Sequence, residues 1–111
     1  MLDIQEEEKN GILIFRLKGR LDATTAPQLD SKIVEAREEG LKSFVLDFKE
    51  VDYLSSAGMR VLLSYTKKLE AANGFLHMFG MHKDIIEIIK MGGFEEILQI
   101  FADEKQALYK D

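Results

Sequence analysis

Two adjacent serines, Ser55 and Ser56, are the side chains of this sequence that are best placed for chemistry. They precede a helical apolar stripe, so either hydroxyl could accept a hydrogen bond from a free N–H of the first turn and cap the helix. The next residues, Ala57 and Gly58, leave that turn without a bulky side chain, so another macromolecule could reach a hydroxyl there. The N–H groups of a helix start also favour negative charge. The pattern therefore fits both an ordinary N-cap and a phosphorylated serine.

The sequence offers neither serine the motif or the general base that a catalytic serine nucleophile needs. The serines do not stand in a G-x-S-x-G motif, and the candidate bases are two histidines, His77 and His82. His77 lies within a predicted strand, between two phenylalanines on its own face, which is typical of a core or rim residue. We therefore predict no catalytic residue and no enzymatic activity. A serine-dependent hydrolase is the formal alternative, and labelling with a fluorophosphonate would detect it.

The sequence does not support a cofactor or metal site either. The chain contains no cysteine, which removes disulfides, thiolate nucleophiles and cysteine metal sites. No glycine-rich phosphate-binding motif follows a strand, so a nucleotide-binding module has only weak support. The acidic pairs Glu38-Glu39 and Glu95-Glu96 are adjacent in sequence and are better explained as solvated surface than as catalytic carboxylates. We predict no cofactor and no metal.

Charge and length favour a small cytoplasmic protein. The 111 residues predict one domain, spanning residues 1–111. The 15 Lys and Arg stand against 20 Asp and Glu, a formal net charge of −5, and the basic residues are scattered along the sequence. Direct binding to nucleic acid is therefore disfavoured, because it draws on a basic patch. The N-terminus lacks the pattern of a secretory signal, and no apolar run approaches the ~20 residues of a membrane span.

A buried strand and the helix after it must position the two serines. Residues 44–48 form a nearly continuous apolar run, typical of a strand that is covered on both faces of a parallel sheet. After a loop over residues 51–58, the helix carries one buried stripe, made of Met59, Leu62, Leu63, Thr66 and Leu69.

The rest of the chain predicts further strands and helices around this unit. Strands over residues 2–8 and 12–18 should form a hairpin through Asn10-Gly11. A helix should begin at a Thr25 cap with Gln28 completing a capping box, and should end at Gly40. The later elements are a strand over residues 75–79, a helix over 83–91, a strand over 97–101 and a helix over 103–109. We therefore predict an α/β fold with an N-terminal β-hairpin, in which a mixed, mainly parallel sheet of four to five strands is layered against about four helices.

Three segments taken together resemble a known family. Residues 19–23 read GRLDA, residues 44–48 read FVLDF, and residues 51–62 read VDYLSSAGMRVL. In this order they closely resemble the STAS domain of bacterial anti-sigma factor antagonists. The resemblance continues through Gly92-Gly93-Phe94 and the apolar residues 97–101, and it covers essentially the whole chain.

The resemblance implies a protein that controls transcription by partner switching. In such families the unphosphorylated antagonist binds an anti-sigma factor, which is also a serine kinase with a histidine-kinase-like ATPase fold, and so releases the sigma factor. Phosphorylation of a serine ends that binding, and a metal-dependent serine phosphatase restores it. The alternative within the superfamily is a subunit of a transporter complex or signalling assembly that is never phosphorylated.

The resemblance also implies which residues form the site. The phosphoacceptor position of the family corresponds to Ser56, with Ser55 as the alternative because the family commonly has Asp where this chain has Ser55. Asp22 matches an acidic residue of the family's first loop, beside the phosphorylation site. The expected partner-binding residues are Asp22, Thr24, Ser55, Ser56, Ala57, Gly58, Met59 and Arg60.

Overall fold

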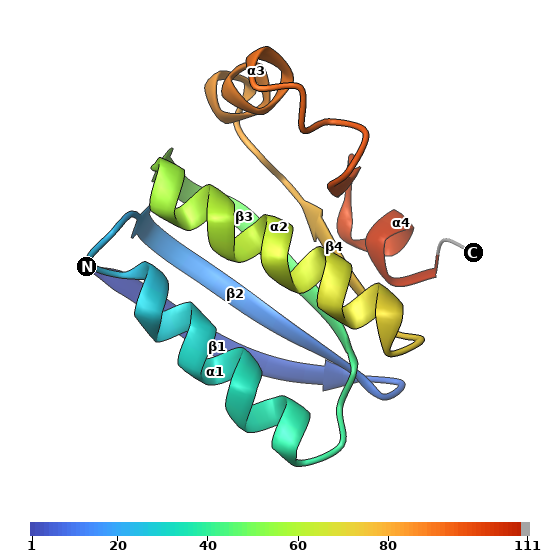
Figure 1. Cartoon of the computed structure of the whole chain (residues 1–111). Coiled ribbons are helices and arrows are strands. Elements are labelled where there is room, and N and C mark those ends of the chain that lie inside the picture. The colour runs from blue at the N-terminus through green and yellow to red at the C-terminus, as the bar shows by residue number, and fades with distance from the viewer. Residues whose placement is uncertain (110–111) are drawn as a thin grey trace.

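The first two strands, β1 (Leu2–Lys9) and β2 (Ile12–Leu21), form the predicted antiparallel hairpin. Asn10 and Gly11 make its turn with positive φ angles of 53° and 80°, the left-handed conformation that an Asn-Gly hairpin turn uses. Three strands parallel to β2 follow in order across the sheet, β3 (Ser43–Leu54), β4 (Phe75–Phe79) and β5 (Gln99–Phe101). The computed structural model describes residues 1–109, and Figure 1 shows this mixed sheet with its two long helices in front of it.

The helices divide unequally between the two faces of the sheet. Helices α1 (Ala26–Glu38), α2 (Ser56–Ala71) and α3 (Lys83–Met91) pack on the face that buries Phe15 of β2 and Leu46 of β3. The short helix α4 (Glu104–Tyr109) packs on the other face, against Ile14 and Val45. Alternating residues of β2 and β3 thus enter two different cores, which explains the nearly continuous apolar run of β3. The predicted fold class is confirmed.

Two strand boundaries differ from the predictions. β3 continues to Leu54, through the segment expected to be a loop, because β2 also continues and pairs Leu21 with Leu54. The ladder contains register shifts between Arg16 and Lys18 and between Gly19 and Arg20, so the simple alternation of side chains does not reveal it. β5 begins at Gln99 rather than at residue 97, because the backbone of the preceding residues turns back to bond to Phe94.

The predicted capping box at the start of α1 is wrong. The Thr25 side chain does not cap the helix. Its hydroxyl donates to the carbonyl of Arg20 at 2.7 Å and accepts from the N–H of Asp22 at 2.9 Å, so it belongs to the turn before the helix. The end of the helix is as expected, with Gly40 at a φ of +96°.

None of the helices described over residues 1–109 has the length and apolar character needed to cross a membrane.

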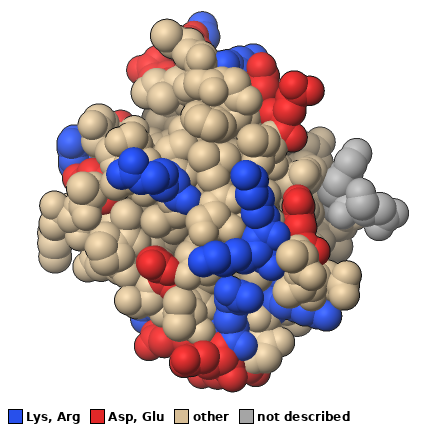
Figure 2. Space-filling model, viewed as in Figure 1, with Lys and Arg blue, Asp and Glu red and all other residues tan. Residues whose placement is uncertain are grey.

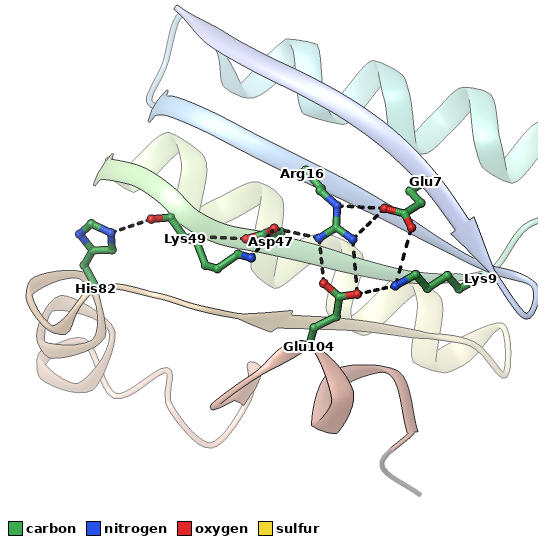
Figure 3. Close-up of polar contacts among 7 residues, drawn as sticks. All are labelled: Glu7, Lys9, Arg16, Asp47, Lys49, His82 and Glu104. Carbon is green, nitrogen blue, oxygen red and sulfur yellow. Dashed lines mark hydrogen bonds and ion pairs between the residues drawn. The ribbon is translucent and has the colours of Figure 1, made fainter.

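An ion network centred on Arg16 joins α4 to three strands (Figure 3). Arg16 Nη1 donates to Asp47 Oδ2 at 3.0 Å and to Glu104 Oε1 at 2.8 Å, and Arg16 Nη2 donates to Glu7 Oε1 at 2.8 Å. Lys9 Nζ donates to the second oxygen of Glu104 at 2.8 Å. These hydrogen bonds, chiefly the one from Arg16, lower the pKa of the Glu104 carboxyl to about 2. The C-terminal helix is therefore held by charge as well as by apolar packing.

Candidate functional site

Ser55 is the N-cap of α2 and is fully engaged in joining β3 to the helix. It has an extended backbone, and its Oγ accepts a hydrogen bond from the Gly58 N–H at 3.2 Å. Its own N–H donates to the Leu21 carbonyl at 2.9 Å, and its carbonyl accepts from the Met59 N–H at 2.9 Å. The structure thus chooses between the two candidate caps left open by the sequence.

Ser56 is the first residue of α2 and is exposed to solvent. Its side chain forms no hydrogen bond with another residue within positions 1–109, since Ser55 supplies the cap. The hydroxyl therefore stands at the positive end of the helix, open to a second macromolecule. The two adjacent serines have different roles, one structural and one available for modification or binding.

Gly58 faces the interior, not the solvent. A Cβ at this position would lie 2.8 Å from the Leu21 carbonyl oxygen and 2.9 Å from a methyl carbon of Leu54. The glycine therefore lets the first turn of α2 lie directly against the ends of β2 and β3. The sequence predicted a first turn without bulky side chains. At Gly58 this absence of a side chain serves the contact with the sheet, and of Ala57 and Gly58 only Ala57 is partly exposed. Met59 is also buried.

Asp22 lies next to this junction, in the loop between β2 and α1. Its neighbour Leu21 is bonded to Ser55, so the two segments meet at the same edge of the sheet. Asp22 Oδ1 accepts from the N–H groups of Thr24 at 3.0 Å and of Thr25 at 3.1 Å. These bonds, the one from Thr25 first, lower the pKa of the Asp22 carboxyl. Asp22 is thus an ionised group that orders its own loop and remains partly exposed, while Thr24 is exposed.

Arg20 and Tyr53 form a contact at this edge that the sequence did not reveal. They are partners in the β2–β3 register, and the Arg20 guanidinium carbon lies 4.1 Å from the centre of the Tyr53 ring. Arg20 Nε is also 3.5 Å from Asp22 Oδ2. A cation over an aromatic face is a favourable arrangement. No sequence signal identifies this pair, because the shifted register alone places the two residues side by side.

Basic side chains gather on the face made by α1 and α2. Figure 2 shows several lysines and arginines together there, although they are scattered along the sequence. The exposed positions of α2 include Arg60, Lys67 and Lys68, and Lys68 Nζ lies 5.0 Å from the centre of the Tyr65 ring. The Arg37 guanidinium of α1 is close enough to act on the ionisation of the same tyrosine. A protein of net negative charge thus has a locally basic helical face that begins near Ser56.

The histidines are engaged elsewhere in the fold. His77 is buried, stacks on Phe75 with ring centres 3.9 Å apart, and bonds through Nδ1 to the Ala107 carbonyl at 2.7 Å. His82 Nε2 bonds to the Lys49 carbonyl at 2.9 Å (Figure 3). Neither supplies a base to Ser55 or Ser56. Within residues 1–109, no cluster of three or more histidine or acidic side chains is placed to hold a metal ion.

Comparisons with known proteins agree on one family. A family model for the STAS domain matches residues 3–107. A Bordetella bronchiseptica protein, BtrV, provisionally named an anti-sigma factor antagonist, is 32% identical over 98 residues, covering 88% of this chain and 84% of that protein. The anti-sigma F factor antagonist of Paenibacillus polymyxa is 28% identical over 108 residues, covering 96% of this chain and 92% of that protein.

A solved structure shares the same fold. The structure of the Bacillus cell fate determinant SpoIIAA in its phosphorylated form superposes with a TM-score of 0.73 at 22% identity, covering 96% of each chain. In this chain, that fold consists of the five-stranded sheet with the N-terminal hairpin and the helical layers described above. The chain belongs to the STAS domain family.

Proposed function

We propose that this chain is an anti-sigma factor antagonist that is switched by phosphorylation of Ser56. The observation that carries the proposal is the division of roles between the two serines. Ser55 is committed to the helix cap, whereas Ser56 is exposed and its hydroxyl forms no hydrogen bond with another side chain or backbone group of residues 1–109. The names of the relatives and the phosphorylated state of SpoIIAA support this function, since both describe proteins of the same fold.

The partner in this proposal is an anti-sigma factor that is also a serine kinase with a histidine-kinase-like ATPase fold. The unphosphorylated antagonist binds it and releases the sigma factor, and a serine phosphatase reverses the modification. The exposed residues Thr24, Ser56 and Arg60 and the partly exposed Asp22 would contact the partner. The buried residues Gly58 and Met59 would act through the position of the first turn of α2, with Ala57 between them partly accessible.

The switch follows from where the phosphate would stand. A phosphate adds about −1.5 to −2 charges, and at a helix N-terminus an anion is tolerated or stabilised. The fold should therefore survive the modification. Binding would be lost at the interface, through repulsion from acidic groups of the partner and through the desolvation of a highly charged group.

The proposal is tested by binding measurements with the anti-sigma factor that this chain captures from its native host. Ser56→Asp should weaken the affinity about tenfold or more, which corresponds to a loss of about 1.4 kcal/mol or more of binding free energy. The melting temperature should change by only a few degrees. Ser31→Asp is the matched control, since Ser31 is an exposed serine on α1 and the substitution adds the same charge there. Equal binding by the Ser56→Asp variant and the wild type would contradict the proposal, and so would a large loss of stability without a specific loss of binding.

A further inference from the structure

Two arginines lie near Ser56, and they are held differently. Arg20 is already paired, with Asp22 at 3.5 Å and with the Tyr53 ring at 4.1 Å. Arg60 is exposed and forms no ion pair within residues 1–109. Arg20 is thus already paired in the unmodified structure, whereas Arg60 is available to pair with a new anion.

Arg60 is four residues after Ser56 on the same helix. Residues spaced by four lie one above the other on a helix surface, and opposite charges at this spacing attract, best when the acidic group is nearer the N-terminus. Gly58 and Met59, which lie between them in sequence, are buried on the opposite side. The remaining residue between them, Ala57, has only a methyl side chain, which is too small to keep Ser56 apart from Arg60.

The first turn of α2 leaves room for an additional acceptor. The N–H groups of Gly58 and Met59 are bonded to the Ser55 side chain and carbonyl. The N–H groups of Ser56 and Ala57 precede them at the helix start, where backbone donors have no intrahelical acceptor. A phosphate on Ser56 would meet these donors on one side and the Arg60 guanidinium on the other, since guanidinium and phosphate groups match in geometry.

We propose that Arg60 is the intramolecular counter-charge for a phosphate on Ser56, and that pairing with the phosphate withdraws Arg60 from the partner surface. This inference rests on the proposed phosphorylation of Ser56. In the unmodified protein, Arg60 is an exposed cation near the start of α2, and we expect it to face an acidic partner surface. In the modified protein, the pair carries a net charge of about −0.5 to −1. Phosphorylation would therefore both add an anion and remove a cation from the same place.

The test measures the phosphate itself and needs no partner. Phosphoserine is incorporated at position 56 during synthesis of the full chain, and the phosphate is titrated by phosphorus NMR at low ionic strength. Arg60 favours the dianion, so Arg60→Gln should raise the midpoint of the second ionisation by about 0.15 to 0.4 pH units. Lys67→Gln, which removes an exposed cation further along α2, should leave it nearly unchanged. High salt should reduce the difference between wild type and Arg60→Gln.

An unchanged midpoint in Arg60→Gln would overturn the inference, and so would equal shifts in the two variants, which would indicate a diffuse field. Circular dichroism of each variant checks that the helix is intact. Because the phosphoserine is installed during synthesis, this result does not depend on a kinase. Pairing with Arg60 in a protein that its host never phosphorylates would support the inference and refute the proposed function. Phosphorylation of Ser56 in the host, combined with an unchanged phosphate midpoint in Arg60→Gln, would support the proposed function and refute the inference.

Discussion

Replacing Ser55 by alanine should destabilise the protein, whereas the same replacement at Ser56 should not. Ser55 caps α2 by accepting the Gly58 N–H at 3.2 Å. Loss of a serine N-cap destabilises proteins by about 0.5–2 kcal/mol. Because 3.2 Å is at the long end of the range for N–H···O bonds, we expect the lower half of that range, about 0.5–1 kcal/mol. Ser56 has no such bond, and alanine is a good helix former, so its replacement should change the stability by less than about 0.5 kcal/mol.

Urea unfolding followed by far-UV circular dichroism measures the difference. With a slope of about 1–3 kcal/mol per molar urea, Ser55→Ala should lower the midpoint by roughly 0.2–1 M with an unchanged slope. Ser55→Asp is the matched control, because aspartate is also a strong N-cap and its charge favours the helix start. It should retain the wild-type midpoint. A larger loss in Ser56→Ala than in Ser55→Ala would refute the division of roles between the two serines.

Three further predictions concern the packing at the start of α2 and two titratable groups elsewhere in the fold. Gly58→Ala should lower the urea midpoint although alanine favours a helix by about 1 kcal/mol, because its Cβ would stand 2.8 Å from the Leu21 carbonyl oxygen; a rise would show that the helix start moves away freely. The lowered pKa of Glu104, about 2, means that its ion pairs stabilise the fold above pH 4.5 and are lost as the pH falls towards 2. Glu104→Gln should therefore flatten the dependence of stability on pH in this window, and parallel wild-type and variant curves would contradict that expectation. Burial lowers the pKa of His77 from 6.5, so the folded state binds its proton less readily than the unfolded state and stability should decline as the pH falls below 6.5; the decline should be absent in His77→Gln, and NMR titration of the imidazole checks the direction of the pKa change.

The sequence predicts those parts of the fold that local patterns determine. The Asn10-Gly11 turn, the apolar run over residues 44–48 and the stripe of α2 each specify an element without reference to distant residues. Gly40 ends α1 as expected, because a left-handed residue after a helix favours glycine. From these elements the α/β class and the hairpin follow.

Features that depend on the register of distant strands were not predictable in the same way. The extension of β3 to Leu54 and the contact between Arg20 and Tyr53 both depend on how β2 is shifted against β3. The Arg16 network likewise brings together β1, β2, β3 and α4. Thr25 shows the same limit, because its hydroxyl bonds to the turn before the helix in place of the local cap that its sequence context favours.

The choice between the two serines needed the structure for a related reason. Either residue satisfies the sequence pattern of an N-cap, and the two readings differ by one position in the helix start. The bond between the Ser55 N–H and the Leu21 carbonyl fixes the junction, so that Ser55 caps and Ser56 begins the helix. The exposure of Ser56, on which the proposed function depends, follows from that tertiary contact.

The most direct test of the central claim is intact-mass measurement and phosphosite mapping of the protein purified from its native host, with and without phosphatase treatment. The account predicts a phosphate-sized mass increment that phosphatase removes and that maps to Ser56. A phosphate on Ser55 would contradict the assignment of the modified residue while preserving a serine switch. No phosphate under any growth condition would contradict the phosphorylation switch and favour a binding subunit that is never modified.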